Sequence, residues 1–118
     1  MKLISTLIAA AAIGLLAATS SSAAAPVTLT GTVGPGFTIT LKQGLKTVKT
    51  LKAGTYTFTI HDKSPIHNFV VEGPGVARDI TTPSFVGTKV VTLKLRHGKY
   101  KFYCRPHESQ MFGFVTVT

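Results

Sequence analysis

After about residue 26 the chain alternates apolar and polar side chains with a period of two, and this pattern restricts its fold more than any other feature. A period of two is typical of a β-strand with one buried face, because successive side chains point to opposite sides of a sheet. No stretch after residue 25 has apolar side chains at the helical spacing over a useful length. The sequence therefore predicts an all-β fold. Strands are expected near residues 27–33, 37–42, 55–60, 91–96, 99–104 and 113–117.

Residues that favour turns separate these runs and set the expected architecture. Their spacing favours a compact Greek-key β-sandwich of about seven to eight strands. Phe37 is expected on the buried face of its strand, with Ile39 and Leu41. The stretch from Gly73 to Thr88 contains prolines and glycines and is expected to be a long irregular connection. The turn signals are Gly34-Pro35-Gly36, Gly44, Gly54, Gly73-Pro74-Gly75 and His97-Gly98.

The first 24 residues have the pattern of a cleavable signal peptide. Lys2 supplies a positive start, residues 3–18 are apolar and nearly uncharged, and residues 19–25 are small. A retained transmembrane anchor is the alternative, but the run is short for a span of roughly 20 residues and no basic stop follows it. We expect a signal peptide at 1–24 and one domain at 25–118, secreted to the periplasm or the cell exterior and without a later membrane segment.

The expected domain is small and strongly basic. Without Lys2 the chain has 12 Lys and Arg against 4 Asp and Glu, a formal charge of 12 − 4 = +8. Because the lysines are spread along the sequence, we expect a broadly positive surface that attracts acidic proteins or anionic polymers. Nucleic acid is a weaker expectation, since export removes that partner and no recognised motif is present. Cys104 is the only cysteine, so no disulfide can form within the chain, and a bound metal is the next candidate for stabilising so small a domain.

Donor atoms suited to a soft metal follow the strand near residues 99–104. Alternation places Cys104 on the inward face at the end of that strand, and His107 and Met111 follow on a short loop. His67, at an upstream strand end, can supply a fourth donor. Two imidazoles, one thiolate and a weak axial thioether form the ligand set of a blue-copper site, whereas a closed zinc site more often has several thiolates.

Each of these residues also has a simpler interpretation. Cys104 alone could be a small buried hydrophobe, His107 an exposed loop residue and Met111 core filler. Their combination in one exported chain favours a metal site over these separate readings. The other two histidines are not expected to be ligands, because His97 lies in a turn and His61 falls on the polar face of its strand.

The chain resembles the cupredoxin family, especially its plastocyanin and azurin-like members. The stretches that carry the resemblance are His67-Asn68-Phe69, Cys104-Arg105-Pro106-His107, and Met111 followed by Gly113 and 115–117. The resemblance implies one type 1 copper ion held by His67, Cys104, His107 and Met111. It also implies that Asn68 ties the two ligand loops together. The interval from His107 to Met111 differs by one residue from those of typical plastocyanins and of the shortest-loop members.

These expectations lead to a function. The predicted protein is a secreted monomer that carries single electrons and meets an acidic redox partner through a small transient interface. An exported copper carrier or buffer that delivers copper to a cuproenzyme is the alternative, because it would use the same ligands. Enzyme classes are disfavoured, since the chain lacks the extra histidines of a second copper centre and the room for a substrate cleft.

Overall fold

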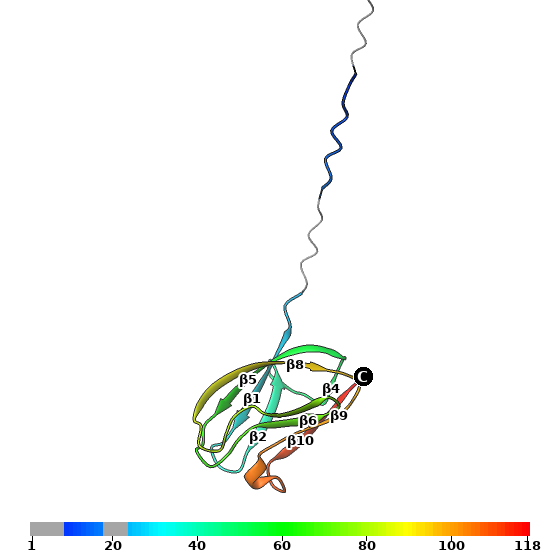
Figure 1. Cartoon of the computed structure of the whole chain (residues 1–118). Coiled ribbons are helices and arrows are strands. Elements are labelled where there is room, and N and C mark those ends of the chain that lie inside the picture. The colour runs from blue at the N-terminus through cyan, green and yellow to red at the C-terminus, as the bar shows by residue number, and fades with distance from the viewer. Residues whose placement is uncertain (1–8, 18–23) are drawn as a thin grey trace, which may run out of the picture.

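The computed structural model describes residues 9–17 and 24–118, and its body is a sandwich of two five-stranded β-sheets (Figure 1). The expected signal peptide falls largely on residues 1–8 and 18–23, which lie outside the described residues. No helix in the described ranges is long and apolar enough to cross a membrane. The strands are β1 (Val27–Val33), β2 (Ile39–Gln43), β3 (Lys46–Thr47), β4 (Thr50–Leu51), β5 (Gly54–Asp62), β6 (Val70–Gly73), β7 (Val76–Asp79), β8 (Gly87–Leu95), β9 (Gly98–Tyr103) and β10 (Phe112–Val117).

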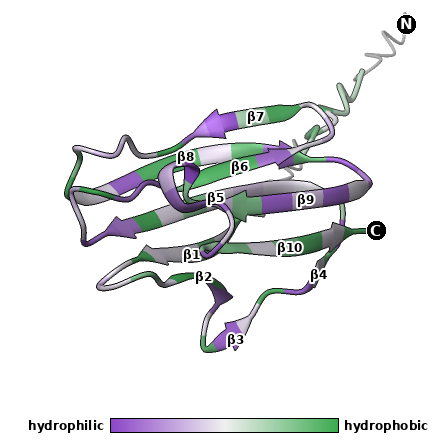
Figure 2. Cartoon of the chain, turned by 90° about the horizontal axis from the view of Figure 1, so that it is seen from below, coloured by the Kyte–Doolittle hydropathy of each residue, from purple (hydrophilic) through white to green (hydrophobic). Residues whose placement is uncertain are grey.

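The strand order is β3-β2-β1-β5-β8 in the first sheet and β4-β10-β9-β6-β7 in the second. Most neighbours are antiparallel, but β1 runs parallel to β5 and β4 runs parallel to β10. The chain crosses between sheets at the β3–β4 connection, so that β3 and β4 are edge strands of different sheets. Figure 2 shows the β2–β3 hairpin standing away from the body of the sandwich.

The core lies between the sheets and is built from the apolar positions of the alternating strands, which confirms the predicted all-β sandwich. In β5, Tyr56, Phe58 and Ile60 are buried while the threonines between them are partly exposed. Tyr100 and Phe102 of β9 face them from the second sheet, and Cys104 continues that buried row. The strand that ends at the candidate ligand is therefore fixed by its packing on the core.

Three local expectations are corrected. The structure has ten strands in its described part rather than seven or eight, because the short β3 and β4 escape detection by alternation. Residues 73–88 are only partly irregular: β6 and β7 form a hairpin whose turn includes Gly75 at φ 72°. Phe37 precedes β2 and is 57% exposed instead of buried, because the turn at Gly34 and Gly36 lifts it off the sheet.

The strand register separates two ends of the sandwich. At one end, which we call the ligand end, β1 finishes at Val33 beside Asp62 of β5, and β9 finishes at Tyr103 beside Phe112 of β10. At the opposite end, Gly54 pairs with Leu95 and Val117 pairs with Gly98. The candidate ligands follow the strands that finish at the ligand end, so the fold gathers them there.

Candidate metal centre

His67 is held at the ligand end by the segment that joins β5 to β6. Its first part is tied down because the Lys63 N–H donates to the Val33 carbonyl at 2.9 Å and the Ser64 N–H donates to Asp62 Oδ1 at 3.2 Å. Its last part is tied down at Phe69, whose N–H donates to Thr81 Oγ1 at 2.9 Å. His67 lies between these anchors and is 1% exposed, so its ring has a fixed position inside the sandwich.

The loop between β9 and β10 is a single compact turn. Cys104 keeps extended backbone angles, φ −96° and ψ 120°, and the 3₁₀ turn Arg105–His107 begins directly after it, with Pro106 in its first positions. The Cys104 N–H donates to the Met111 carbonyl at 2.9 Å, and the Met111 N–H donates to the His107 carbonyl at 2.9 Å. These two bonds close the loop and hold its three predicted ligands in fixed relation.

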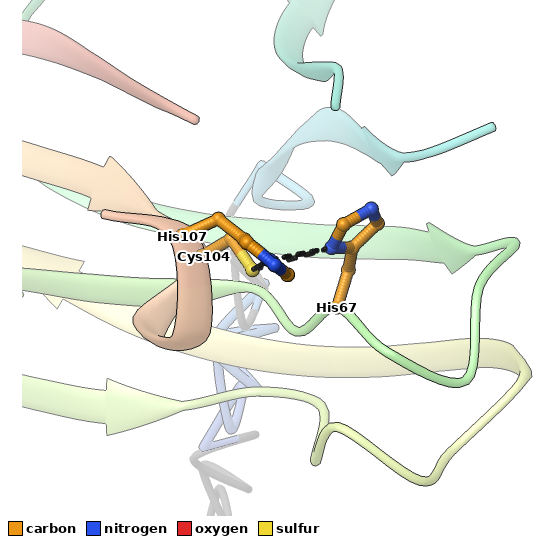
Figure 3. Close-up of side chains that lie close together, drawn as sticks. All are labelled: His67, Cys104 and His107. Atoms are coloured by element: carbon orange, nitrogen blue, oxygen red, sulfur yellow. Dashed lines mark hydrogen bonds between the residues drawn. The ribbon is translucent and has the colours of Figure 1, made fainter. Parts of the chain in front are cut away.

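The side chains of His67, Cys104 and His107 converge from these two segments, as Figure 3 shows. The two imidazole Nδ1 atoms are 3.0 Å apart, and Cys104 Sγ is 3.7 Å from each of them. A metal about 2.0 Å from nitrogen and about 2.3 Å from sulfur fits inside a triangle of these dimensions. Two imidazoles and one soft thiolate in this arrangement suit copper, so the residues present fit the metal that the sequence predicts.

Met111 is fully buried, with 0% exposure, and belongs to the hydrophobic core. Its backbone bonds to both Cys104 and His107 place it directly beside the converging donors. Its role as the weak axial ligand stays a prediction. The position suits that role, because a thioether is an apolar side chain that packs in a core and still offers a soft sulfur.

Asn68 lies next to His67, is completely buried, and links the two ligand segments. Its Oδ1 accepts a hydrogen bond from the Arg105 N–H at 2.8 Å. Arg105 directly follows Cys104, so this single bond holds the second segment against the first. Such a link matters because, in the described part of the chain, the two segments are otherwise joined through the converging donors and through the sheet, where Val70 pairs with Tyr103.

Phe37 is a neighbour of the site that the sequence did not reveal. Its ring packs edge-on against both imidazoles, with centroids 5.4 Å from His67 and 4.9 Å from His107. The alternation pattern pointed to the core instead, and the only sequence signal for its true place is the Gly34-Pro35-Gly36 turn before it. Phe37 therefore covers the histidine pair from the β1–β2 connection.

A polar cluster on the outer face of the second sheet anchors the ligand loop from outside. The Arg105 guanidinium binds Asp79 of β7 at 2.6 and 3.1 Å and lies 3.5 Å from Glu72. The hydroxyl of Tyr103 donates to the same Glu72 carboxylate. Burial, and then the Glu72 hydrogen bond and charge, raise the pKa of Tyr103 to about 12, so this phenol stays protonated at neutral pH. The contact with Asp79 raises the pKa of Arg105.

The remaining histidines lie outside the cluster, as expected from their faces. His61 is on the outer face of β5, where its Nδ1 is 3.0 Å from Thr88 Oγ1, and His97 is exposed in the β8–β9 turn. Asp62, at the end of β5, is 2% exposed, and burial raises the pKa of its carboxyl above the usual value against the opposing effects of Thr81 and the Ser64 N–H.

A β-sandwich that gathers two imidazoles and one thiolate at the ends of its strands defines a blue copper protein of the cupredoxin class. The comparison of sequences is more specific. The profile of the copper binding proteins of the plastocyanin/azurin family matches residues 38–118, which include every predicted ligand. The chain belongs to this family, and its cofactor is a single type 1 copper ion.

Solved structures agree with this assignment at the level of the fold. A structure of rusticyanin superimposes with a TM-score of 0.59 at 23% identity, covering 82% of this chain and 80% of the other. Auracyanin A, a blue copper protein from the green thermophilic photosynthetic bacterium Chloroflexus aurantiacus, superimposes with a TM-score of 0.55 at 23% identity, covering 80% of this chain and 100% of the other. No curated protein sequence is significantly similar to the chain.

Proposed function

We propose that the protein is an exported electron carrier whose copper is held by His67, Cys104 and His107, with Met111 as the weak axial ligand. The observation that carries this proposal is the convergence of the three donor atoms within 4.8 Å of one another on a rigid β-scaffold. Bound copper supplies the chemistry by cycling between Cu(I) and Cu(II), since thiolate and thioether suit the first state and imidazole suits the second.

The chain's own residues keep this site from rearranging. His67, Cys104 and Met111 are each at most 1% exposed, and backbone hydrogen bonds close the loop that carries the last two. Ligands held in this way have little freedom to move when the charge at the site changes by one unit. A small rearrangement favours fast electron transfer, because little reorganisation has to accompany each step.

His107 is the donor nearest to solvent, since it is only half-buried while the other two are enclosed. Exposed apolar side chains lie at the same end of the sandwich, with Phe37 at 57%, Ile66 at 56% and Phe112 at 47% exposure. We propose that a redox partner docks on this apolar surface through a small transient interface, with the His107 ring as the port for the electron. The net positive charge attracts an acidic partner from a distance.

The export signal belongs to the same proposal. Residues 1–24 are removed after secretion, and residues 25–118 work in the periplasm or outside the cell as a monomer with no enzymatic activity. Mass measurement of the exported protein tests this part, with an N-terminus at Ala25 expected, or at Ala24 if cleavage falls one residue earlier. An N-terminus at Met1 would contradict it.

The electron-carrier proposal is tested by adding one equivalent of Cu(II) and recording the visible absorbance and EPR spectra. An intense blue band with narrow copper hyperfine splitting is expected, and Cys104→Ser should lack both. His61→Ala is the matched control, because this histidine lies outside the cluster and should leave the spectrum unchanged. A pale, ordinary Cu(II) spectrum from the unaltered protein would rule out the assigned ligand set.

Burial of the donor atoms also favours an electron carrier over the alternative, a protein that delivers copper. A protein that delivers copper must release it, whereas His67 and Cys104 are closed off from solvent and Phe37 covers the histidines. We expect a chelator to remove copper slowly compared with the rate of redox cycling. Release within seconds to excess chelator would favour copper delivery instead.

A further inference from the structure

Four lysines between residues 42 and 52 lie along one edge of the sandwich. The β2–β3 hairpin and the crossing to β4 form this edge, which Figure 2 shows projecting from the body. All four of its lysines are exposed. We call this surface the basic edge, and it consists of Lys42, Lys46, Lys49 and Lys52.

Nothing on the first part of the chain neutralises this charge. No Asp or Glu occurs between Ala24 and His61, which covers β1 to β4 and nearly all of β5. Within the described residues, the ion pairs join Lys101 to Glu108 and Arg105 to Glu72 and Asp79, all in the second sheet or its ligand loop. Each lysine of the basic edge therefore keeps its charge available for an external partner.

Two further lysines lie beside the basic edge, at the end of the sandwich remote from the metal centre. Lys94 pairs with Thr55, three residues after Lys52, and Lys99 pairs with Thr116, which also pairs with Thr50 of β4. The positive surface thus extends from the basic edge to the end opposite the metal centre. Three of the molecule's four carboxylates surround Tyr103 and Arg105 beside the ligand loop, and the fourth, Asp62, is buried.

Leu45 gives the basic edge a second property. It stands at the tip of the β2–β3 hairpin and is 97% exposed, so its side chain makes almost no contact with its own protein. An apolar side chain at a projecting tip, followed closely by lysines, combines the two attractions that hold a protein at an anionic bilayer. These are insertion of apolar surface into the headgroup layer and attraction of basic residues to anionic lipid.

We propose that the basic edge docks on an anionic phospholipid surface, with Leu45 entering the headgroup layer. The strand register supports this orientation. Thr50 and Leu51 of β4 pair with Thr116 and Val117 of β10, which lie at the end of the sandwich opposite the ligand loop. A protein seated by its basic edge therefore keeps His107 and the apolar surface around it directed away from the bilayer and open to a partner.

The insertion is tested with the exported protein and a tryptophan reporter. The natural chain has no tryptophan, so Leu45→Trp introduces the only one, at the hairpin tip. We expect its emission to shift to the blue on mixing with vesicles of phosphatidylglycerol and phosphatidylcholine. Phe112→Trp is the matched control, because it replaces a half-exposed aromatic residue at the ligand end and should not shift. Equal shifts, or a shift of the control alone, would overturn the proposed orientation.

The electrostatic part is tested by co-sedimentation with the same vesicles. Lys46→Gln with Lys49→Gln should weaken binding about tenfold or more, since each lysine near an anionic surface contributes severalfold. Lys63→Gln with Lys89→Gln removes the same charge elsewhere and should weaken binding much less. Equal losses for the two pairs would show that only net charge matters and would overturn the docking site.

Two further measurements exclude other occupants. Leu45→Ser should weaken vesicle binding severalfold while leaving binding to soluble dextran sulfate unchanged, because only a bilayer accepts the leucine. If the unaltered protein binds dextran sulfate but not vesicles, the partner is an anionic polymer and the proposal fails. Unchanged far-ultraviolet circular dichroism for each variant shows that the loss of binding does not come from unfolding.

Discussion

At the scale of single residues, the side chain of Asn68 is central to how the two ligand loops are held together. One hydrogen bond from the Arg105 N–H joins two loops that have no other polar link in the described structure apart from the converging ligands themselves. A buried acceptor of this kind contributes more than an exposed one, because its loss leaves a donor without a partner in a place that water reaches poorly. The residue therefore acts by positioning the ligands.

We predict that Asn68→Ala lowers the unfolding free energy of the copper-free protein by about 1–3 kcal/mol. Urea denaturation followed by circular dichroism measures this quantity. Thr38→Ala is a suitable control, since Thr38 Oγ1 donates a hydrogen bond to the Pro35 carbonyl at an exposed position and its loss should change stability by less than about 0.5 kcal/mol. Similar losses for both variants would mean that Asn68 does not hold the loops together.

A second prediction at this scale concerns Asp62 and the dependence of folding stability on pH. Burial raises the pKa of its carboxyl in the folded protein, so the unfolded chain loses this proton first as the pH rises. The contribution of Asp62 to stability is thus full below its ordinary pKa of about 4 and is lost as the pH rises towards the folded value. Asp62→Asn should make the copper-free protein more stable than the unaltered one at pH 7.

The measurement is urea denaturation of both forms across the acidic range. The advantage of Asp62→Asn should shrink as the pH falls below about 4, where the carboxyl is protonated in both states. If the difference in unfolding free energy between the two forms is the same at every pH, the pKa of the carboxyl does not differ between the folded and unfolded protein.

At the scale of elements, the pairing of β9 with β10 depends on a glycine. Gly113 pairs with Phe102, and a Cβ added there would lie 2.2 Å from Phe102 Cζ. The phenyl ring cannot easily move aside, because it is stacked on Phe69 with centroids 5.8 Å apart. The ligand loop is therefore flanked by a strand pair that tolerates no side chain at this position.

We predict that Gly113→Ala destabilises the protein by about 1–3 kcal/mol through overpacking. Gly54→Ala is the matched control, since a Cβ at Gly54 meets no atom within 4 Å and should change stability by less than about 0.5 kcal/mol. Thermal or urea unfolding of the two variants provides the comparison. If Gly113→Ala is as stable as Gly54→Ala, the strands separate more readily than their packing indicates.

The same elements show what the sequence could predict. The alternation in β5 and β9 identified the buried faces correctly, because those strands are long and lie inside their sheets. It failed for β3 and β4, since two residues carry no periodicity, and for the β6–β7 hairpin, where Gly73-Pro74-Gly75 forms a tight turn instead of starting a long connection. Short elements are fixed by their partners rather than by their own pattern.

The metal centre was likewise only partly predictable from the sequence. The convergence of Cys104 and His107 follows from their spacing on one loop, and His67 follows from donor chemistry, so a pattern of residue types was enough for these. The contact of Phe37 with both imidazoles and the ion pair of Arg105 with Asp79 join residues that are far apart in sequence. Such contacts depend on which loops the topology brings together, and composition carries no information about that.

At the scale of the whole molecule, one small domain with a single buried cysteine has no covalent cross-link to restrict its unfolded state. Its family cofactor takes over part of this role, because an ion bound only by the folded chain shifts the folding equilibrium. The donors come from both sides of the sandwich's ligand end, so unfolding has to separate them. Stability and metal content are therefore coupled.

We predict that removing copper lowers the unfolding free energy by about 4 kcal/mol when free copper exceeds its dissociation constant about a thousandfold. For a domain of this size the melting temperature should fall by about 15 °C or more. Differential scanning calorimetry with and without copper measures both. Cys104→Ser should show a much smaller rise on adding copper, and an equal rise would mean that the metal stabilises the protein from another site.

The pairing of Val70 with Tyr103 brings one further consequence. This pair stands three residues after His67 and one before Cys104, so it sets the distance between the two loops. A slip of β6 by a single position would send every side chain of the strand to the opposite face and carry His67 away from its partners. The blue colour of the reconstituted protein therefore reports whether β6 has the correct register. During refolding, chains that collapse with a wrong register would remain colourless. The rate at which the blue band appears would therefore measure how fast the correct register forms.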